Sequence, residues 1–384
     1  MPVSTPSVRI RDIETIPLRI PFAKPFSFAA PTDTKRESVE VMIVRITTEE
    51  GLVGVGETQA WRRQGSFETL TGLHATIQEV FKPLILGRSP FAINAIMRDL
   101  AYAADHSLYA QAAVGDALYD LMGKALDLPL STLLGGEVRD RIPVGLALSI
   151  TEPDAMIDQA QAAYDSGYRH LRIKIGLDPR LDVTNVRRMR EHFGDRAVLR
   201  ADANGGLSYN EALPLLHRLD DYGLDVVEQP VPGWDLQGMA RLGQSVRTPI
   251  SADESLSSGH SLLDIVKQRA ATIIQTKTGK NGGIHSIRRL WTIAQEAGIG
   301  IFPGNHPGTS VATAAVAHLC ASYAGPLLVG DFQTGSTSML ADDVVRDPIR
   351  VEDGAVRAPS GPGLGVELDS EKLDRYRIDG GGGS

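Results

Sequence analysis

The chain has 384 residues, of which 42% are apolar and 22% charged, and its formal net charge is −8. This composition predicts a folded protein with a large core, and the length predicts about two domains. The negative charge argues against a nucleic-acid or membrane-surface partner, which would favour a basic face, but it allows a small anionic ligand in a locally basic pocket.

Cys320 is the only cysteine, so no disulfide can form within the chain. The N-terminal sequence MPVSTPSVRIRD is polar and lacks the apolar segment of a signal peptide. No run of about 18 apolar residues predicts a transmembrane helix. We therefore expect a cytoplasmic protein. The final GGGGS, residues 380–384, is typical of an added linker and is left out of the predicted fold.

Residues 1–136 predict an α+β domain. VRIRDIETIPLRI and VEVMIVRITT alternate apolar and polar residues, and EEG followed by LVGVGET predicts a hairpin. Helices are predicted in SFETLTGLHATIQEVFKPLI, with Ser66 as its N-cap, and then in NAIMRDLAYAADH and YAQAAVGDALYDLMGKALDL. The sequence LLGG near residue 136 is expected to close this domain.

From residue 137 to about residue 340, strands alternate with helices. Strands are predicted at RIPVGLAL, HLRIKIG, AVLRADA, DVVEQP, TPISADES, TIIQTKTG, GIGIFPG and PLLVGDF. Such alternation predicts a parallel sheet, and about eight repeats over this length favour a (β/α)8 barrel over an open doubly wound sheet. The Pro- and Gly-rich segment 341–379 has no barrel pattern and is expected to pack back on the first domain.

Charged residues recur where these strands end. In HLRIKIGL, Arg172 and Lys174 share one strand face, and burying an unpaired ammonium there would be costly. Charged residues then follow at intervals of 28, 26, 25 and 24 residues, in the order Lys174, Asp202, Glu228, Asp253 and Lys277. These intervals match one strand–helix unit of a barrel, whose active site lies at the C-terminal strand ends. We therefore expect these side chains to converge.

Neighbouring carboxylates repel one another unless a cation lies among them. Asp202, Glu228 and Asp253 suit a hard divalent ion with oxygen ligands, so we expect Mg²⁺, with Mn²⁺ as an alternative. No His or Cys accompanies them at the strand ends, which argues against zinc. Taken singly, each acid would also suit a helix cap, and Lys174 would also suit a structural ion pair. The joint pattern favours a site.

Together these residues resemble the enolase superfamily, specifically the muconate lactonizing enzyme subgroup of the mandelate racemase/muconate lactonizing enzyme family. The resemblance covers nearly the whole chain and implies an α+β capping domain (1–136), a modified (β/α)8 barrel (137–340) and a C-terminal segment (341–379) that completes the capping domain. It implies metal ligands and two catalytic lysines, and KNGG after the second lysine is also similar to the subgroup. The metal ligands are Asp202, Glu228 and Asp253, and the lysines are Lys174 and Lys277.

The chain departs from the family pattern at three places. Arg172 replaces the first lysine of the family's Lys-x-Lys pair. The stretch 331–333, DFQ, stands where dipeptide epimerases carry Asp-x-Asp for a substrate ammonium, and it also lacks the glutamate usual in muconate enzymes. His306 lies where the mandelate racemase subgroup has a catalytic histidine, but Lys277 replaces its acidic partner. We expect His306 to be either a substrate hydrogen-bond donor or a structural loop residue.

The resemblance implies proton transfer at the carbon next to a carboxylate, through an enediolate that the metal stabilises, in a homo-oligomeric isomerase. Positive charge near Lys174 would disfavour its ammonium form and leave a basic amine. Adjacent arginines in ETQAWRRQG suggest an anionic distal group on the substrate, although a solvated surface pair is the alternative. The residues expected to bind substrate are Trp61, Arg62, Arg63, Arg172, Asn204 and His306.

The leading hypothesis is a cycloisomerase of the muconate lactonizing type acting on a dicarboxylate. The alternative on the same machinery is a racemase or epimerase of N-acyl amino acids or dipeptides. The two lysines do not separate these reactions, because a racemase needs a base on each face and a cycloisomerase needs one lysine for the proton. A non-catalytic binding or structural protein is the alternative of another class, and the intact set of strand-end residues argues against it.

Overall fold

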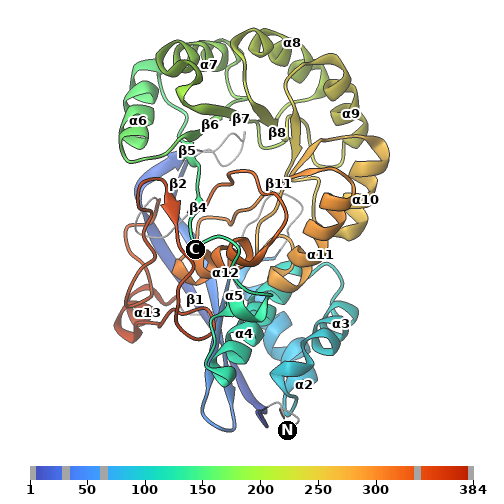
Figure 1. Ribbon diagram of the computed structural model, residues 1–384, viewed down its shortest axis with the longest axis vertical. Coiled ribbons are helices and arrows are strands. Elements are labelled where there is room, and N and C mark those ends of the chain that lie inside the picture. The colour runs from blue at the N-terminus through green and yellow to red at the C-terminus, as the bar shows by residue number, and fades with distance from the viewer. Residues whose placement is uncertain (1–5, 28–34, 61–67, 333–338, 379–384) are drawn as a thin grey trace.

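The computed structural model describes residues 6–27, 35–60, 68–332 and 339–378. A curved parallel sheet ringed by helices forms the upper part of the molecule in Figure 1, and the N-terminal helices and long strands form the lower part. The C-terminal segment returns to lie near the N-terminal strands (Figure 1). This arrangement confirms the predicted modified barrel with an α+β capping domain.

The N-terminal sheet has three antiparallel strands in the order β1 (Ile10–Ser27), β2 (Lys35–Thr48) and β3 (Val53–Gln59). Two glycines of β3 allow helix α4 (Leu108–Leu126) to pack unusually close to the sheet. A Cβ added at Gly54 would lie 2.3 Å from the Ala117 carbonyl oxygen, and one added at Gly56 would lie 2.1 Å from that of Ala113. A side chain at either position would therefore push α4 away.

The predicted N-terminal helices are present, but the first begins later than expected. Thr69, rather than Ser66, caps it: the Thr69 hydroxyl accepts a hydrogen bond from the Gly72 N–H at 3.1 Å. Ser66 itself lies outside the described residues. The helices are α1 (Leu70–Ala75), continued by a π-helical turn (Thr76–Phe81) and α2 (Lys82–Ile85), then a 3-10 turn (Pro90–Ala92), α3 (Ile93–Ala103), α4 and α5 (Leu130–Leu133).

Within the described residues, the barrel sheet contains seven parallel strands, which neighbour one another in sequence order. They are β5 (Leu146–Leu148), β6 (His170–Lys174), β7 (Val198–Asp202), β8 (Val226–Glu228), β9 (Ile250–Ala252), β10 (Ile273–Gln275) and β11 (Gly300–Phe302). Helices cover the outside of this sheet (Figure 1): α6 (Pro153–Asp165), α7 (Pro179–Phe193), α8 (Tyr209–Leu219), α9 (Leu236–Ser245), α10 (Gly259–Gln268), α11 (Gly283–Glu296) and α12 (Ser310–Ser322). Short 3-10 turns follow α7 (Gly194–Arg196) and α8 (Asp220–Tyr222).

The eighth predicted strand, PLLVGDF, is not a regular strand in the described chain. It runs as an extended segment that links the two edges of the sheet. The Leu328 N–H donates to the Ile301 carbonyl of β11, and the Gly145 N–H donates to the Gly330 carbonyl, each at 2.8–2.9 Å. Gly330 lies so close to Pro303 that no side chain would fit there. The segment closes the barrel through single hydrogen bonds rather than a ladder.

The C-terminal segment contacts both parts of the molecule. Its strand β12 (Ala355–Val356) pairs with β4 (Ile142–Pro143), the first half of the predicted strand RIPVGLAL. Its last helix, α13 (Ser370–Tyr376), leads to a hydrogen bond from the Ile378 N–H to the Pro17 carbonyl of β1 at 3.0 Å.

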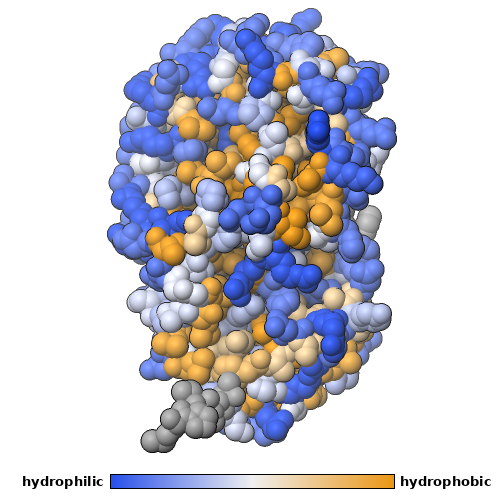
Figure 2. All heavy atoms as spheres, turned by 45° about the vertical axis from the view of Figure 1, so that its right-hand side comes forward, coloured by the Kyte–Doolittle hydropathy of each residue, from blue (hydrophilic) through white to orange (hydrophobic). Residues whose placement is uncertain are grey.

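Hydrophilic residues cover most of the face drawn in Figure 2, and apolar residues gather in its middle and toward its lower end. The most exposed large apolar side chains of the described chain are Tyr102 (92%) and Trp234 (82%). None of the described helices is both long and apolar enough to span a membrane.

Two buried carboxylates of the N-terminal domain cap helices of the barrel. Glu57, at β3, accepts hydrogen bonds from the backbone N–H groups of Thr309 (3.0 Å) and Ala312 (3.2 Å) at the start of α12. Asp116, on α4, accepts one from the Ile284 N–H (2.8 Å) at the start of α11. Free N–H groups at a helix start need such acceptors, so these contacts join the two domains.

Asp116 is expected to make stability depend on pH. Burial raises its pKa to about 7 from the usual 3.8. The folded state therefore binds a proton that the unfolded state releases between about pH 4 and 7, and the stability from this group is lost as pH rises through that window. Asp116→Asn keeps an acceptor for Ile284 but removes the titration. From pH 5 to pH 8 the variant should gain stability relative to the parent, by up to roughly 3 kcal/mol.

Urea unfolding at the two pH values measures this difference. Asp140→Asn is the matched control, because Asp140 is exposed and pairs with Arg357 at the surface (2.9 Å). Equal pH dependence in the parent and in Asp116→Asn would contradict the prediction.

Candidate active site

The strand-end residues predicted from the sequence lie side by side in the barrel. Lys174 on β6 is the register partner of Asp202 on β7, and Asp202 is the register partner of Glu228 on β8. Asp253 directly follows β9, and Lys277 lies two residues beyond β10. Each of these side chains is at most 8% exposed. Because the strands neighbour one another in this order, the lysines flank the row of carboxylates.

Lys174 is held at the first end of this row. Its ammonium lies 2.5 Å from Asp202 Oδ2 and donates to Asn204 Oδ1 at 2.7 Å. Asn204 has a φ of 48°, a left-handed conformation that Asn tolerates, and its N–H donates to Asp202 Oδ1 at 2.8 Å. Burial lowers the pKa of Lys174, and Arg172 adds to the lowering. The ammonium of Lys174 is therefore buried but paired with a carboxylate.

Asp253 lies between two lysines at the other end of the row. Its Oδ2 is 2.5 Å from the Lys277 ammonium, and its Oδ1 is 2.6 Å from that of Lys280. Burial raises the pKa of Asp253, but the two lysines outweigh burial and hold it well below its usual range. Sequence reasoning missed Lys280, although it noted the KNGG motif; the motif's lysine was the available signal.

Two arginines bind Glu228 in the middle of the row. Arg172 Nη1 donates to Glu228 Oε1 at 2.9 Å, and Arg200 Nη2 donates to Oε2 at 2.6 Å. Arg200 is 1% exposed, and its guanidinium lies 3.7 Å from the centre of the Phe302 ring. Sequence reasoning missed Arg200 as well. Its position two residues before Asp202 on β7 places both on the same strand face, a signal that was present.

The same arginines also engage Asp331, the residue aligned with the first acid of the epimerase Asp-x-Asp pattern. Asp331 Oδ2 is 3.1 Å from Arg172 Nε and 3.3 Å from Arg200 Nη1. The two arginines hold the pKa of Asp331 below its usual range despite burial. This carboxylate is thus already neutralised by guanidinium groups of the protein.

His306 lies in the loop after β11 and is 2% exposed. Its ring stacks on Tyr109 of α4, with ring centres 5.8 Å apart. Burial, with a further contribution from Lys277, lowers the pKa of His306 well below 6.5, so the ring is neutral. The structure brings His306 to the domain interface, where a neutral imidazole can donate one hydrogen bond and accept another.

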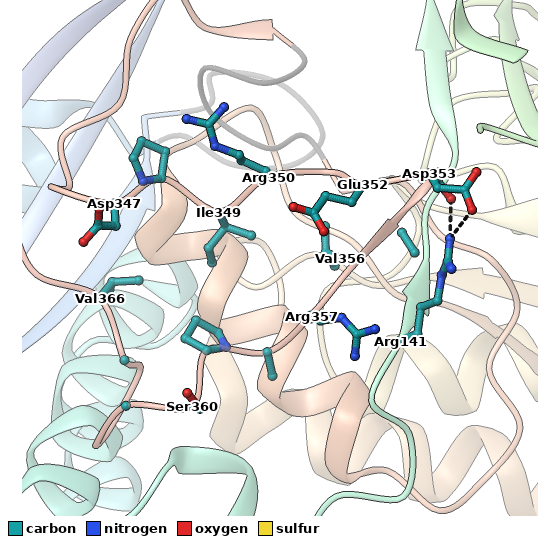
Figure 3. Close-up of a pocket in the computed structure, with 16 residues that line it drawn as sticks. Arg141, Asp347, Ile349, Arg350, Glu352, Asp353, Val356, Arg357, Ser360 and Val366 are labelled. Carbon is teal, nitrogen blue, oxygen red and sulfur yellow. Dashed lines mark hydrogen bonds and ion pairs between the residues drawn. The ribbon is translucent and has the colours of Figure 1, made fainter. Parts of the chain in front are cut away.

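Trp61, Arg62 and Arg63, which were expected to bind substrate, lie outside the described residues. A cavity of about 660 Å³ lies elsewhere, between the C-terminal segment and the start of the barrel. Figure 3 shows that Arg141, Glu352, Asp353 and Arg357 line it, and that Arg141 pairs with Asp353. Of the predicted site residues that the structure describes, none lines this cavity.

The donor atoms of the carboxylate row bear on whether it can hold a metal ion. Asp202, Glu228 and Asp253 are buried oxygen donors on adjacent strand ends, which is the chemistry that Mg²⁺ prefers. As the side chains stand, the described residues contain no group of three or more His, Cys, Asp or Glu arranged to hold an ion. The reason is visible in the contacts, because ammonium and guanidinium groups lie against these carboxylate oxygens. The chemistry of the donor set suits a divalent ion, and in this structure Lys174, Arg172 and Lys277 balance the charge of the carboxylates.

Comparisons with known proteins agree with this architecture. Residues 11–135 match the family model "Mandelate racemase / muconate lactonizing enzyme, N-terminal domain", and residues 155–372 match "Enolase C-terminal domain-like". The chain is 32% identical to muconate cycloisomerase 1 of Rhodococcus opacus, over 96% of this chain and 98% of that protein. It is also 32% identical to the L-Ala-D/L-Glu epimerase of Bacillus subtilis, over 94% and 97%.

Among solved structures, the muconate lactonizing enzyme from Pseudomonas fluorescens complexed with muconolactone is similar over 97% of this chain and all of that chain. The TM-score is 0.90 at 29% identity. These relatives are isomerases, which removes the alternative of a non-catalytic protein on the same fold. The chain is therefore an enzyme of the enolase superfamily and belongs to the muconate lactonizing enzyme subgroup of the mandelate racemase/muconate lactonizing enzyme family.

Proposed function

We propose that this enzyme is a Mg²⁺-dependent cycloisomerase of a dicarboxylate, which transfers a proton at the carbon next to a carboxylate. One observation carries the proposal. Lys174 on β6 and Lys277 after β10 lie at opposite ends of a row of buried carboxylates on the strands between them. A substrate carboxylate bound at the middle of this row would have its neighbouring carbon between the two amines.

Asp202, Glu228 and Asp253 would hold the metal ion. When bound, the ion would neutralise the negative charge that builds up on the substrate carboxylate as the proton leaves. With the charge of Asp202 and Asp253 balanced in this way, the amines of Lys174 and Lys277 would be available to the substrate. Arg172 and Arg200 would orient Glu228, and Asn204 would orient Lys174. Mn²⁺ would serve as an alternative ion.

A dicarboxylate is favoured over a dipeptide by the state of Asp331. A carboxylate that recognises a substrate ammonium needs a negative charge that the protein does not already balance. The charge of Asp331 is balanced by Arg172 and Arg200. The muconate cycloisomerases among the relatives support a diacid. Arg62 and Arg63 would bind the distal carboxylate, and Trp61 and His306 would contact the substrate.

A second candidate is a racemase or epimerase of N-acyl amino acids. The paired lysines favour it, because a racemase needs one base on each face of the reacting carbon. The B. subtilis relative is named as an epimerase. An N-acyl amino acid has no free ammonium, so the neutralised Asp331 does not argue against it.

The test is reaction in deuterated water, followed as deuterium incorporation into the lactone formed from cis,cis-muconate and as α-proton exchange of the enantiomers of N-acetylglutamate and of an L-Ala-Glu dipeptide. We expect turnover of the diacid, its loss on exhaustive chelation and its return with added Mg²⁺. Full activity after chelation would remove the metal from the proposal. Exchange of the dipeptide alone would replace the cycloisomerase with an epimerase.

Variants of Arg62 and Arg63 test whether the substrate carries a second carboxylate. Arg62→Ala and Arg63→Ala should each lower the diacid kcat/KM by about 10- to 150-fold, the equivalent of losing a charged hydrogen bond. A matched monoacid should be turned over equally by both variants and the parent. Unchanged diacid efficiency in both would remove the preference for a dicarboxylate.

A further inference from the structure

The turn after β10, residues 277–283 with the sequence KTGKNGG, contains several buried polar side chains that make hydrogen bonds. Lys277, Lys280 and Asn281 within it are each at most 6% exposed. We call this segment the 277–283 turn. Only Lys277 has a part in the proposed chemistry, so the roles of Lys280 and Asn281 are open.

All three N–H donors of the Lys280 ammonium make hydrogen bonds within the protein. An ammonium has three N–H donors. Those of Lys280 reach Asp253 Oδ1 at 2.6 Å, the Asp253 backbone carbonyl, and the Gln275 carbonyl at 3.3 Å. Within the described residues, Lys277 has a single hydrogen-bond acceptor, Asp253 Oδ2. Lys280 is therefore fully occupied, whereas Lys277 has donors to spare for a ligand.

Asn281 fixes the backbone of Lys277 itself. Its side chain is fully buried, and its Oδ1 accepts a hydrogen bond from the Lys277 N–H at 2.8 Å. Its amide nitrogen donates to the carbonyls of Leu256 (3.1 Å) and Ser257 (3.2 Å) in the loop after β9. The Asn281 side chain thus connects the start of the turn to the loop after β9, and these hydrogen bonds restrict movement of the Lys277 backbone.

The glycines of the turn allow the capping domain to press against it. A Cβ at Gly279 would lie 3.1 Å from Gln59 Oε1 of β3. A Cβ at Gly283, which has a φ of 74°, would lie 2.6 Å from Asp116 Oδ1 of α4. The turn is held from the β9 side by Lys280 and Asn281, and from the capping domain by these close contacts.

We propose that Lys280 and Asn281 are positioning residues that hold Lys277 on one face of the substrate. Asn281 sets the place of the Lys277 backbone. Lys280 holds Asp253 in place through Oδ1 and the backbone carbonyl, so that Asp253 keeps its position when the Lys277 ammonium leaves Oδ2 for the substrate. This inference rests on the proposed function, because it assumes that Lys277 serves as an acid or base.

Two variants test it, Asn281→Leu and Lys280→Met, which keep side-chain volume and remove the polar contacts. The probe is exchange of the α-proton of each enantiomer of N-acetylglutamate in deuterated water. The enantiomer that Lys277 serves is identified by its loss in Lys277→Ala. Each variant should lower kcat for that enantiomer by about 10- to 100-fold, since small misplacements of a catalytic group have effects of this size. Exchange of the other enantiomer should stay within about threefold.

A general loss of structure would lower exchange of both enantiomers together. Asn185→Leu is the matched control for such a loss, because Asn185 is equally buried and donates to the Thr151 carbonyl at 3.1 Å, in a different loop. Equal losses for both enantiomers in the turn variants, or no loss in either, would overturn the inference.

A second measurement does not depend on activity. Deuterium uptake by backbone amides, followed by mass spectrometry, should rise in the peptide covering residues 276–283 of Asn281→Leu and stay unchanged in the peptide covering β6. If the parent exchanges neither enantiomer, the enzyme does not racemise N-acetylglutamate. Deuterium uptake by the backbone amides then still decides whether Asn281 holds the 277–283 turn in place. Unchanged uptake in residues 276–283 would overturn the clamp whatever the activity.

Discussion

Replacing Glu228 by Gln is expected to lower turnover by at least about 1,000-fold and to destabilise the fold by about 3 kcal/mol. The first effect follows from the proposed metal site, since a ligating carboxylate helps to supply several kcal/mol of charge stabilisation. The second follows from Arg172 and Arg200, which donate to the two oxygens of Glu228 at 2.9 and 2.6 Å. Removing one partner of a buried ion pair leaves the other uncompensated.

Asp331→Asn separates these two effects. Asp331 lies near the same two arginines, at 3.1 and 3.3 Å, but it is not a proposed metal ligand. Urea unfolding should show a similar loss of stability in both variants, whereas calorimetric titration with Mg²⁺ should show lost binding in Glu228→Gln only. Equal losses of metal binding and turnover in the two variants would mean that Glu228 acts through the arginines and not as a ligand.

Removing either catalytic lysine is expected to have the second large effect. Lys174→Met and Lys277→Met each delete a buried ammonium that contacts a carboxylate at 2.5 Å. General acid–base groups contribute about 100- to 10,000-fold to rate. In a racemase, each variant should lose exchange from one enantiomer and keep exchange from the other. In a cycloisomerase, one lysine should carry most of the proton transfer, and the other should affect it far less.

Exchange rates for the parent and both variants, measured with saturating Mg²⁺, distinguish these outcomes. Lys124→Met serves as the control, because Lys124 is also paired with a buried aspartate, Asp120 at 2.6 Å, but lies on α4 in the capping domain. Equal partial losses in Lys174→Met and Lys277→Met, without stereochemical asymmetry, would contradict both mechanisms.

The barrel and its row of charges were predictable because each rests on a periodic signal. Strand–helix alternation gave the sheet, and the regular spacing from Lys174 to Lys277 placed the charged ends together. The prediction of an eighth strand was wrong. PLLVGDF has strand-like residues, yet Gly330 packs against Pro303, and the segment makes only isolated hydrogen bonds to β11 and Gly145. Strand propensity does not report such tertiary contacts.

The partners of the site residues were harder to predict than their positions. The spacing predicted that Glu228 and Asp253 would converge. It did not predict that Arg200, two residues before the end of β7, would reach Glu228, or that Lys280, in the turn after β10, would reach Asp253. Long side chains have several rotamers, and which acceptor they reach depends on the folded backbone. The capping residue Thr69 was missed for a similar reason, since any of several Ser and Thr residues near the helix start would suit the pattern.

The helix caps that cross between domains limit how this enzyme can be recombined. Glu57 and Asp116 belong to the capping domain, but they complete the starts of α12 and α11 in the barrel. A chimera that borrows its capping domain from a relative would leave the N–H groups of Thr309, Ala312 and Ile284 without these acceptors unless the donor carries matching acids on its third strand and fourth helix. The two domains are therefore not independent modules, and a graft intended to change substrate preference must carry this pair of carboxylates with it.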